Sequence, residues 1–184
     1  MKKLPIILVL ILNTFVMAQN EEKLPFYQIP DYAETYTPGT VASRMVDGLG
    51  FRYYWATEGL KPEDLNYKPS ESGRTSKETI AHIFGLSNFI LKSISSDFKA
   101  LEAEDMTFQE QRKQTLLNFQ KASELLRGTN DLSKFDNEKF PFWNLINGPI
   151  SDALWHCGQV VMLRRASGNP FNSKVSVFSG KLRE

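Results

Sequence analysis

TSKETIAHIFGLSNFILKSISSDF, residues 75–98, combines a helix start with a long amphipathic run. Thr75 and Glu78 have the spacing of a capping box, in which each side chain accepts a hydrogen bond from a backbone N–H at the helix start. Apolar residues follow at intervals of three and four, which is typical of a helix with one buried face. The stretch therefore predicts a helix that packs against other apolar surfaces.

Three further segments have comparable signals at both ends. Each begins with a threonine at the cap position or a proline in the first turn, and each ends close to a glycine or a proline. Their apolar residues also recur at three and four, and no alternating strand pattern of similar length competes. We expect these helices over residues 37–59, 107–127 and 149–167.

Four amphipathic helices in one chain predict an all-α fold, most simply a four-helix bundle. The connection between the third and fourth helices, residues 128–148, is long for its kind, which indicates either a crossover that spans the bundle or a lid. The single cysteine, Cys157, cannot form an internal disulfide, so stability must come from an apolar core. A chain of 184 residues is long enough to bury one.

The N-terminus has the pattern of a secretory signal peptide, with a basic head, an apolar core and small residues before an expected cleavage after Ala18. The apolar run is shorter than the roughly 20 residues that span a bilayer, so we expect no stable membrane anchor after cleavage. The mature protein is then secreted or periplasmic. The expected organisation is a signal peptide (1–18), an N-terminal lead-in (19–36), a helical bundle (37–170) and a C-terminal arm (171–184).

The charge of the chain is close to neutral. The formal net charge of +1 becomes −1 when Lys2 and Lys3 leave with the signal peptide. The sequence has no basic patch of the kind that binds nucleic acid or anionic lipid, and no glycine-rich phosphate loop. We therefore expect no nucleic-acid partner, and we consider a small-molecule substrate and a homodimer as the candidate interactions.

Both histidines of the chain lie in predicted helices. Asp152 and His156 are four residues apart, so they project from one helix face, and Gln159 lies a turn further along the same stripe. His82 lies in an early turn of the 75–98 helix, which an antiparallel bundle can bring to the same place. Imidazole nitrogen and carboxylate oxygen are good ligands for divalent metals, so we hypothesise a metal held by His82, Asp152 and His156.

Simpler roles for the same residues stay open on spacing alone. A histidine on a partly apolar face is often a hydrogen-bonded core residue, and an aspartate four residues before it can be a local partner only. Cys157 follows His156 directly, but neighbours on a helix point about 100° apart, which favours a buried thiol over a nucleophile. Arg164 and Arg165 suit the negative end of their own helix dipole.

Two blocks give the chain a resemblance to a known family. They are GLGFRYYWATEGLKPEDLNYKPSESGRTSKETIAHI, residues 48–83, and DALWHCGQVVMLRRASGNP, residues 152–170. Through them, residues 38–170 resemble the DinB superfamily, bacterial four-helix bundle proteins related to the transferases that use mycothiol or bacillithiol. The resemblance implies a four-helix bundle of the DinB-like type.

Members of this family typically hold a divalent metal with one histidine at the start of the second helix and two on the last helix. The resemblance places His82 and His156 at the first and last of these positions, and Asp152 stands in place of the middle histidine. A carboxylate can also ligate a metal, but it changes the charge of the site. Zinc, nickel, manganese and iron are therefore not distinguished.

Two functions follow from these expectations. The first is a metal-dependent transferase or hydrolase of unknown substrate. Four residues are expected to line its pocket or to support the ligands: Trp55, Glu58, Trp155 and Gln159. The alternative is an exported binding or structural bundle without catalysis, in which the three polar residues form a hydrogen-bonded cluster.

Overall fold

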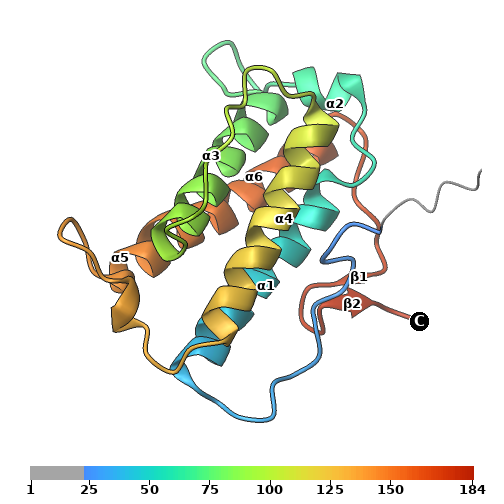
Figure 1. The fold of residues 1–184 in the computed structure, drawn as a ribbon. Helices are drawn as coiled ribbons and strands as arrows, with labels where there is room; N and C mark the ends of the chain where they lie inside the picture. The colour runs from blue at the N-terminus through green and yellow to red at the C-terminus, as the bar shows by residue number, and fades with distance from the viewer. Residues whose placement is uncertain (1–22) are drawn as a thin grey trace, which may run out of the picture.

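The computed structural model describes residues 23–184 and is mostly helical over this range (Figure 1). Its four long helices are α1 (Pro38–Thr57), α3 (Ser76–Ile94), α4 (Phe108–Arg127) and α6 (Ser151–Ala166). α1 and α3 each pack against both α4 and α6. The predicted all-α class is confirmed. No helix within the described range is long and apolar enough to cross a membrane, and the predicted signal peptide lies outside that range.

The predicted starts of the first three long helices are confirmed. The side chains of Thr37, Thr75 and Thr107 each accept a hydrogen bond from the backbone N–H three residues later. At α3 and α4 the carboxylates of Glu78 and Glu110 accept the threonine N–H at 2.7 Å, which completes the two predicted capping boxes. These bonds satisfy first-turn groups that have no partner inside the helix.

The predicted start of the fourth helix at Pro149 is wrong. Helical structure begins earlier, with α5 (Phe142–Leu145), and continues through a π-helical turn, η2 (Ile146–Ile150), into α6. Proline has no N–H to donate, and the wide π turn accommodates Pro149 without ending the helix. Asp152, in the first turn of α6, therefore follows helical structure directly and not a loop.

The sequence signals miss two short elements. α2 (Pro62–Asn66) follows α1, and a 3-10 turn, η1 (Ser133–Phe135), lies in the connection before α5. Pro62, interpreted as a stop signal for α1, is the first residue of α2, where its missing N–H costs nothing. In the same connection the Phe140 ring stacks on Phe89 of α3, with 5.7 Å between centroids. The connection therefore packs beside the C-terminal half of α3.

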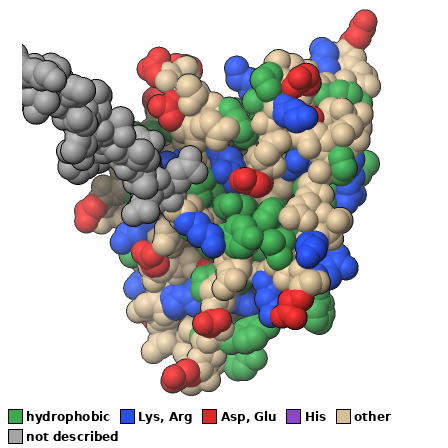
Figure 2. All heavy atoms as spheres, turned by 90° about the vertical axis from the view of Figure 1, so that its right-hand side faces the viewer, with side chains coloured by type: hydrophobic (Ala, Val, Ile, Leu, Met, Phe, Trp, Pro, Cys, Tyr) green, Lys and Arg blue, Asp and Glu red, His purple; other side chains and the backbone are tan. Residues whose placement is uncertain are grey.

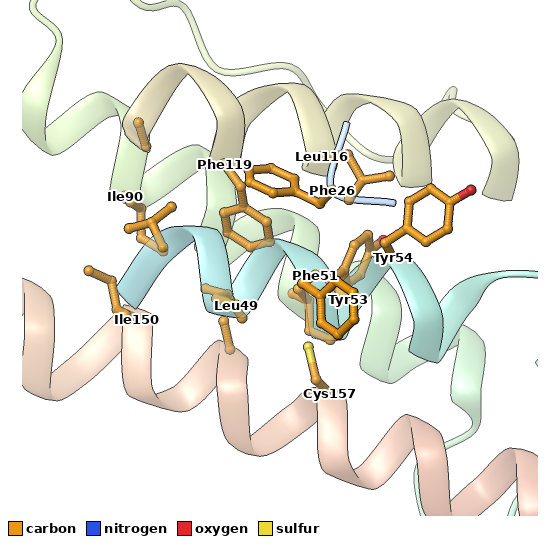
Figure 3. Close-up of a cluster of buried hydrophobic side chains, with 14 of the residues drawn as sticks. Phe26, Leu49, Phe51, Tyr53, Tyr54, Ile90, Leu116, Phe119, Ile150 and Cys157 are labelled. Carbon is orange, nitrogen blue, oxygen red and sulfur yellow. The ribbon is translucent and has the colours of Figure 1, made fainter. Parts of the chain in front are cut away.

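The core between the long helices is rich in aromatic side chains (Figure 3). Phe51 and Tyr53 of α1 are fully buried, and the Tyr53 ring meets Phe119 of α4 edge to face at 6.0 Å. Cys157 projects from α6 toward α1 and is 2% exposed. Each large apolar side chain buried in this way contributes about 1.5–3 kcal/mol, so the cluster holds α6 firmly against α1.

The two ends of the described chain pack together. The C-terminal segment forms an antiparallel hairpin of β1 (Val175–Ser176) and β2 (Lys181–Leu182). Ile29 of the lead-in donates its N–H to the Gly180 carbonyl beside β2 at 2.8 Å. Val175 is buried, so the predicted C-terminal arm docks against its own chain.

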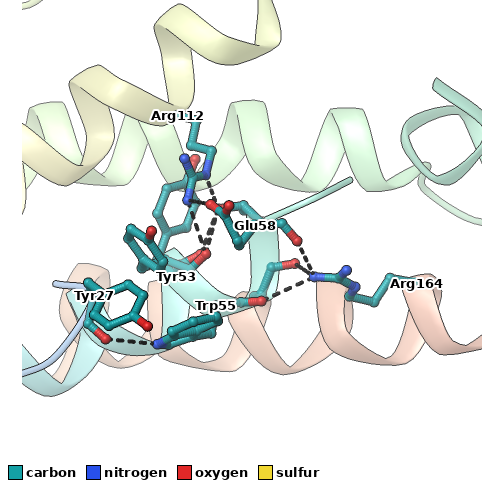
Figure 4. Close-up of polar contacts among 9 residues, drawn as sticks. Tyr27, Tyr53, Trp55, Glu58, Arg112 and Arg164 are labelled. Atoms are coloured by element: carbon teal, nitrogen blue, oxygen red, sulfur yellow. Dashed lines mark hydrogen bonds and ion pairs between the residues drawn. The ribbon is translucent and has the colours of Figure 1, made fainter. Parts of the chain in front are cut away.

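A buried arginine joins the end of α1 to the end of α6 (Figure 4). Arg164 of α6 is 2% exposed. Its guanidinium donates to the carbonyls of Trp55, Ala56 and Glu58 at 3.1, 3.0 and 2.9 Å. The last carbonyls of a helix lack partners inside it, so Arg164 caps α1 from outside. It also donates to the Asn169 carbonyl, just beyond its own helix, at 2.7 Å.

Replacing Arg164 by alanine should lower the free energy of unfolding by about 3 kcal/mol or more, because buried carbonyls of α1 lose their donor. Urea unfolding followed by circular dichroism measures the change. Arg165→Ala is the matched control: Arg165 is adjacent but exposed, and its loss should cost less than about 0.5 kcal/mol. Equal effects of the two substitutions would contradict the capping role of Arg164.

Cys157 should be inert toward thiol reagents in the folded protein. Burial raises the pKa of its thiol to about 12, and only the thiolate reacts. A dithiobis-nitrobenzoate reagent should therefore leave the native protein unmodified near neutral pH and label it fully in denaturant. Rapid labelling of the native protein would show that the thiol is accessible and would restore Cys157 as a candidate nucleophile.

Candidate metal centre

The structure brings Asp152 and both histidines together between α3 and α6. The Nε2 atom of His82 on α3 lies 3.2 Å from Asp152 Oδ2 on α6. The Nε2 atom of His156, one turn further along α6, lies 3.4 Å from Asp152 Oδ1. The two imidazole rings meet edge to face, with 4.6 Å between centroids. One ligand atom from each residue lies within 4.8 Å of the other two, a spacing compatible with a shared metal ion.

Gln159 fixes the orientation of the His156 ring. The Nδ1–H of His156 donates to the Gln159 side-chain carbonyl at 2.7 Å. In a neutral imidazole with this tautomer, Nε2 carries a lone pair, and the nearest carboxylate oxygen of Asp152 is also an acceptor. Two acceptors repel each other unless a proton or a cation lies between them. Histidine ligands of metals commonly have this arrangement, with the second ring nitrogen donating to a carbonyl or carboxylate.

The cluster is accessible to solvent on one side. The side chains of His82 and Asp152 are 39% and 41% exposed, whereas that of His156 is 13% exposed. A groove of about 910 Å³ begins at His156. Its volume is in the range of small-molecule sites. A ligand in the groove would therefore lie directly beside the cluster.

Side chains from α6, from the loop between α2 and α3, and from α3 line this groove, and α3 contributes Thr79. α6 contributes Trp155 and Gln159, both predicted as pocket residues, together with Met162. The loop between α2 and α3 contributes Tyr67 and Arg74, which the sequence reasoning did not single out. A loop leaves no periodic signal in a sequence, and its position opposite α6 follows from the unpredicted helix α2. The TSKE sequence at the start of α3 follows this loop directly and lies close to His82 in the sequence. It was therefore the one sequence signal that the loop ends near His82.

Trp55 and Glu58, the other two predicted pocket residues, do not line this groove. The Trp55 indole N–H donates to the Tyr27 carbonyl of the lead-in at 3.1 Å. The Glu58 carboxylate accepts from Arg112 of α4, whose guanidinium also donates to the Thr57 hydroxyl at 2.9 Å (Figure 4). Helical spacing predicts the face of α1 on which these two residues lie, but it does not predict which other element packs against that face.

The 128–148 connection, predicted as a crossover or a lid, contributes no side chain to the groove. It packs by Phe140 on Phe89 and leads into α5 at the end of α3 remote from α2 (Figure 1). Within the described chain, the groove is bordered by α6, by the α2–α3 loop and by Thr79 at the start of α3.

No family model, curated protein or solved structure matches the chain. Membership of the DinB superfamily therefore stays a prediction from the two sequence blocks. The meeting of His82, Asp152 and His156 is independent of that prediction, because it rests on the geometry of α3 and α6 alone.

Proposed function

We propose that the protein is an exported metal-dependent enzyme, a transferase or hydrolase that acts on a small molecule bound in the groove beside His156. The observation that carries this proposal is the convergence of His82, Asp152 and His156, whose ligand atoms lie within 4.8 Å of one another. The chain has only two histidines, and both belong to this cluster. A purely structural use of histidine does not require that coincidence.

The donor set fits a divalent metal. Two imidazoles and one carboxylate are ligands of borderline divalent ions, and three protein ligands leave positions for water and substrate. A metal held there supplies Lewis acidity to the reaction. Asp152 neutralises part of the charge of the cation, and Gln159 keeps His156 in the tautomer that can ligate. Trp155 and Met162, 72% and 64% exposed, offer apolar surface to the body of a substrate.

A four-helix bundle of the DinB-like type is part of the proposal. Four long helices pack around a shared core, and the candidate ligands lie on the second and the last of them. This distribution supports the resemblance, which implies ligands on the same two helices. Asp152 in the middle position gives the site a negative charge that an all-histidine site lacks.

A non-catalytic role is the second candidate. The Asp152 carboxylate reaches both imidazoles directly, so the three side chains form a polar cluster that ties α3 to α6. Such a cluster suits an exported binding or structural bundle. The two candidates differ in one measurable property, which is the binding of metal.

The purified protein, prepared without a histidine tag, should contain a divalent metal in near-stoichiometric amount by plasma mass spectrometry. His156→Ala and Asp152→Ala should each lose the metal, because two ligands hold it far more weakly than three. Asp152→His should retain it, since histidine restores a third ligand, and Asp105→Ala is the control for loss of an exposed aspartate elsewhere. Metal-free wild type after incubation with zinc, nickel, manganese and iron would overturn the enzyme proposal.

Removal of metal should lower the thermal midpoint of the wild type. A ligand that binds only the folded chain stabilises it by about 2.7 kcal/mol when its free concentration is 100-fold above Kd. Melts with excess zinc and with chelator should differ by several degrees for the wild type and coincide for His156→Ala. Gln159→Leu should give an intermediate difference, because losing the partner of a histidine ligand typically costs about 10–100-fold in affinity. Identical wild-type melts would favour the polar cluster without metal.

A further inference from the structure

A second cavity lies between α1, α6 and the C-terminal segment. Its volume is about 420 Å³, within the range of small-molecule sites. All three elements contribute apolar side chains to its walls. The largest of these are Phe51, Trp55, Leu154, Val161, Phe171 and Val177.

Two arginines line the same cavity, Arg52 from α1 and Arg165 from α6. The Arg52 guanidinium donates to the Gly48 carbonyl of its own helix at 2.9 Å. The Arg165 guanidinium lies over the Phe171 ring, 5.4 Å from its centroid. Within residues 23–184 neither arginine forms an ion pair with a carboxylate, and no aspartate or glutamate lines the cavity. Among the described residues, the cavity therefore combines apolar walls with two guanidinium groups that have no carboxylate partner.

The C-terminal segment that lines one side of this cavity has more basic than acidic side chains. The C-terminal segment carries Lys174, Lys181 and Arg183 against Glu184. Figure 2 shows the side of the molecule that bears this segment: hydrophobic side chains gather there among Lys and Arg side chains, with Asp and Glu side chains interspersed, and neither histidine is in view. The basic side chains of this segment favour the approach of an anion.

We propose that the cavity binds a small amphipathic anion, a molecule with one apolar chain or ring and one carboxylate or similar acidic head. Apolar walls account for the binding of the chain, since burying methylene groups away from water is favourable. Arg52 and Arg165 account for the acidic head, because guanidinium groups pair well with carboxylates and are weakly hydrated. The site does not depend on the metal, and Gly158 is the single residue that borders both this cavity and the groove beside His156.

Calorimetric titration with octanoate, 1-octanol and octylammonium tests the ligand class on the wild-type protein. The three molecules share one alkyl chain and differ in charge. Octanoate should bind to one saturable site. 1-Octanol should bind about tenfold or more weakly, because a hydrogen bond to a charged group contributes about 1.5–3 kcal/mol. Octylammonium, which has the same sign of charge as the arginines, should not bind measurably. Equal binding of octanoate and 1-octanol would overturn the assignment of the arginines.

Substitutions of the two arginines test whether octanoate binds in this cavity. Arg52→Gln combined with Arg165→Gln should weaken octanoate binding by about tenfold or more, with unchanged circular dichroism and thermal midpoint. Arg74→Gln is the matched control, because Arg74 lines the groove beside His156. It should leave octanoate binding unchanged, and so should a chelator.

Three results would overturn the proposal. They are the absence of octanoate binding, octanoate binding that the double variant retains, and binding that Arg74→Gln removes. Binding to phosphatidylglycerol vesicles that depends on Arg52 and Arg165, without octanoate binding, would assign these arginines to a membrane surface instead. None of these results affects the metal measurements, so the two proposals fail separately.

Discussion

The guanidinium of Arg164 supplies donors that the end of α1 lacks, and this interaction joins the first long helix of the bundle to the last. α1 ends at Thr57, and the next residue, Glu58, has an extended backbone, so no further helical turn donates N–H groups to the last carbonyls of the helix. Because Arg164 reaches them from α6, the two helices are fixed relative to each other along their length as well as face to face. Apolar contacts alone allow helices to slide, whereas three hydrogen bonds to a planar group do not.

The same end of the molecule carries the polar contacts that place α2. Asp64 of α2 accepts hydrogen bonds from Ser167 and Asn169, just beyond α6. Burial acts to raise the pKa of Asp64, but these bonds outweigh it and lower the pKa, so the carboxylate stays ionised close to Arg164. α2 is thereby tied to the end of α6, and the loop that follows it is held opposite Trp155. The groove beside His156 is thus a consequence of the polar end of the bundle.

Local chemistry explains which features are predictable from the sequence. Threonine caps act within four residues, so three helix starts were predictable, whereas the π turn around Pro149 depends on packing of the segment before α6. The spacing on one helix indicated Asp152 and His156, and the family resemblance indicated both of them together with His82. Arg164 was expected to serve its own helix, and its contacts with α1 join residues more than a hundred positions apart. Long-range pairing of this kind leaves no local pattern.

The π turn ahead of α6 has a geometric consequence for the candidate metal centre. A π turn takes one residue more than an α turn, so it rotates every later side chain by about 100° relative to an uninterrupted α-helix. The direction in which Asp152 and His156 point is therefore determined by the number of residues between Phe142 and Ser151 as well as by their identity. The geometry of the candidate metal centre therefore depends partly on the length of a stretch that contains none of its three residues.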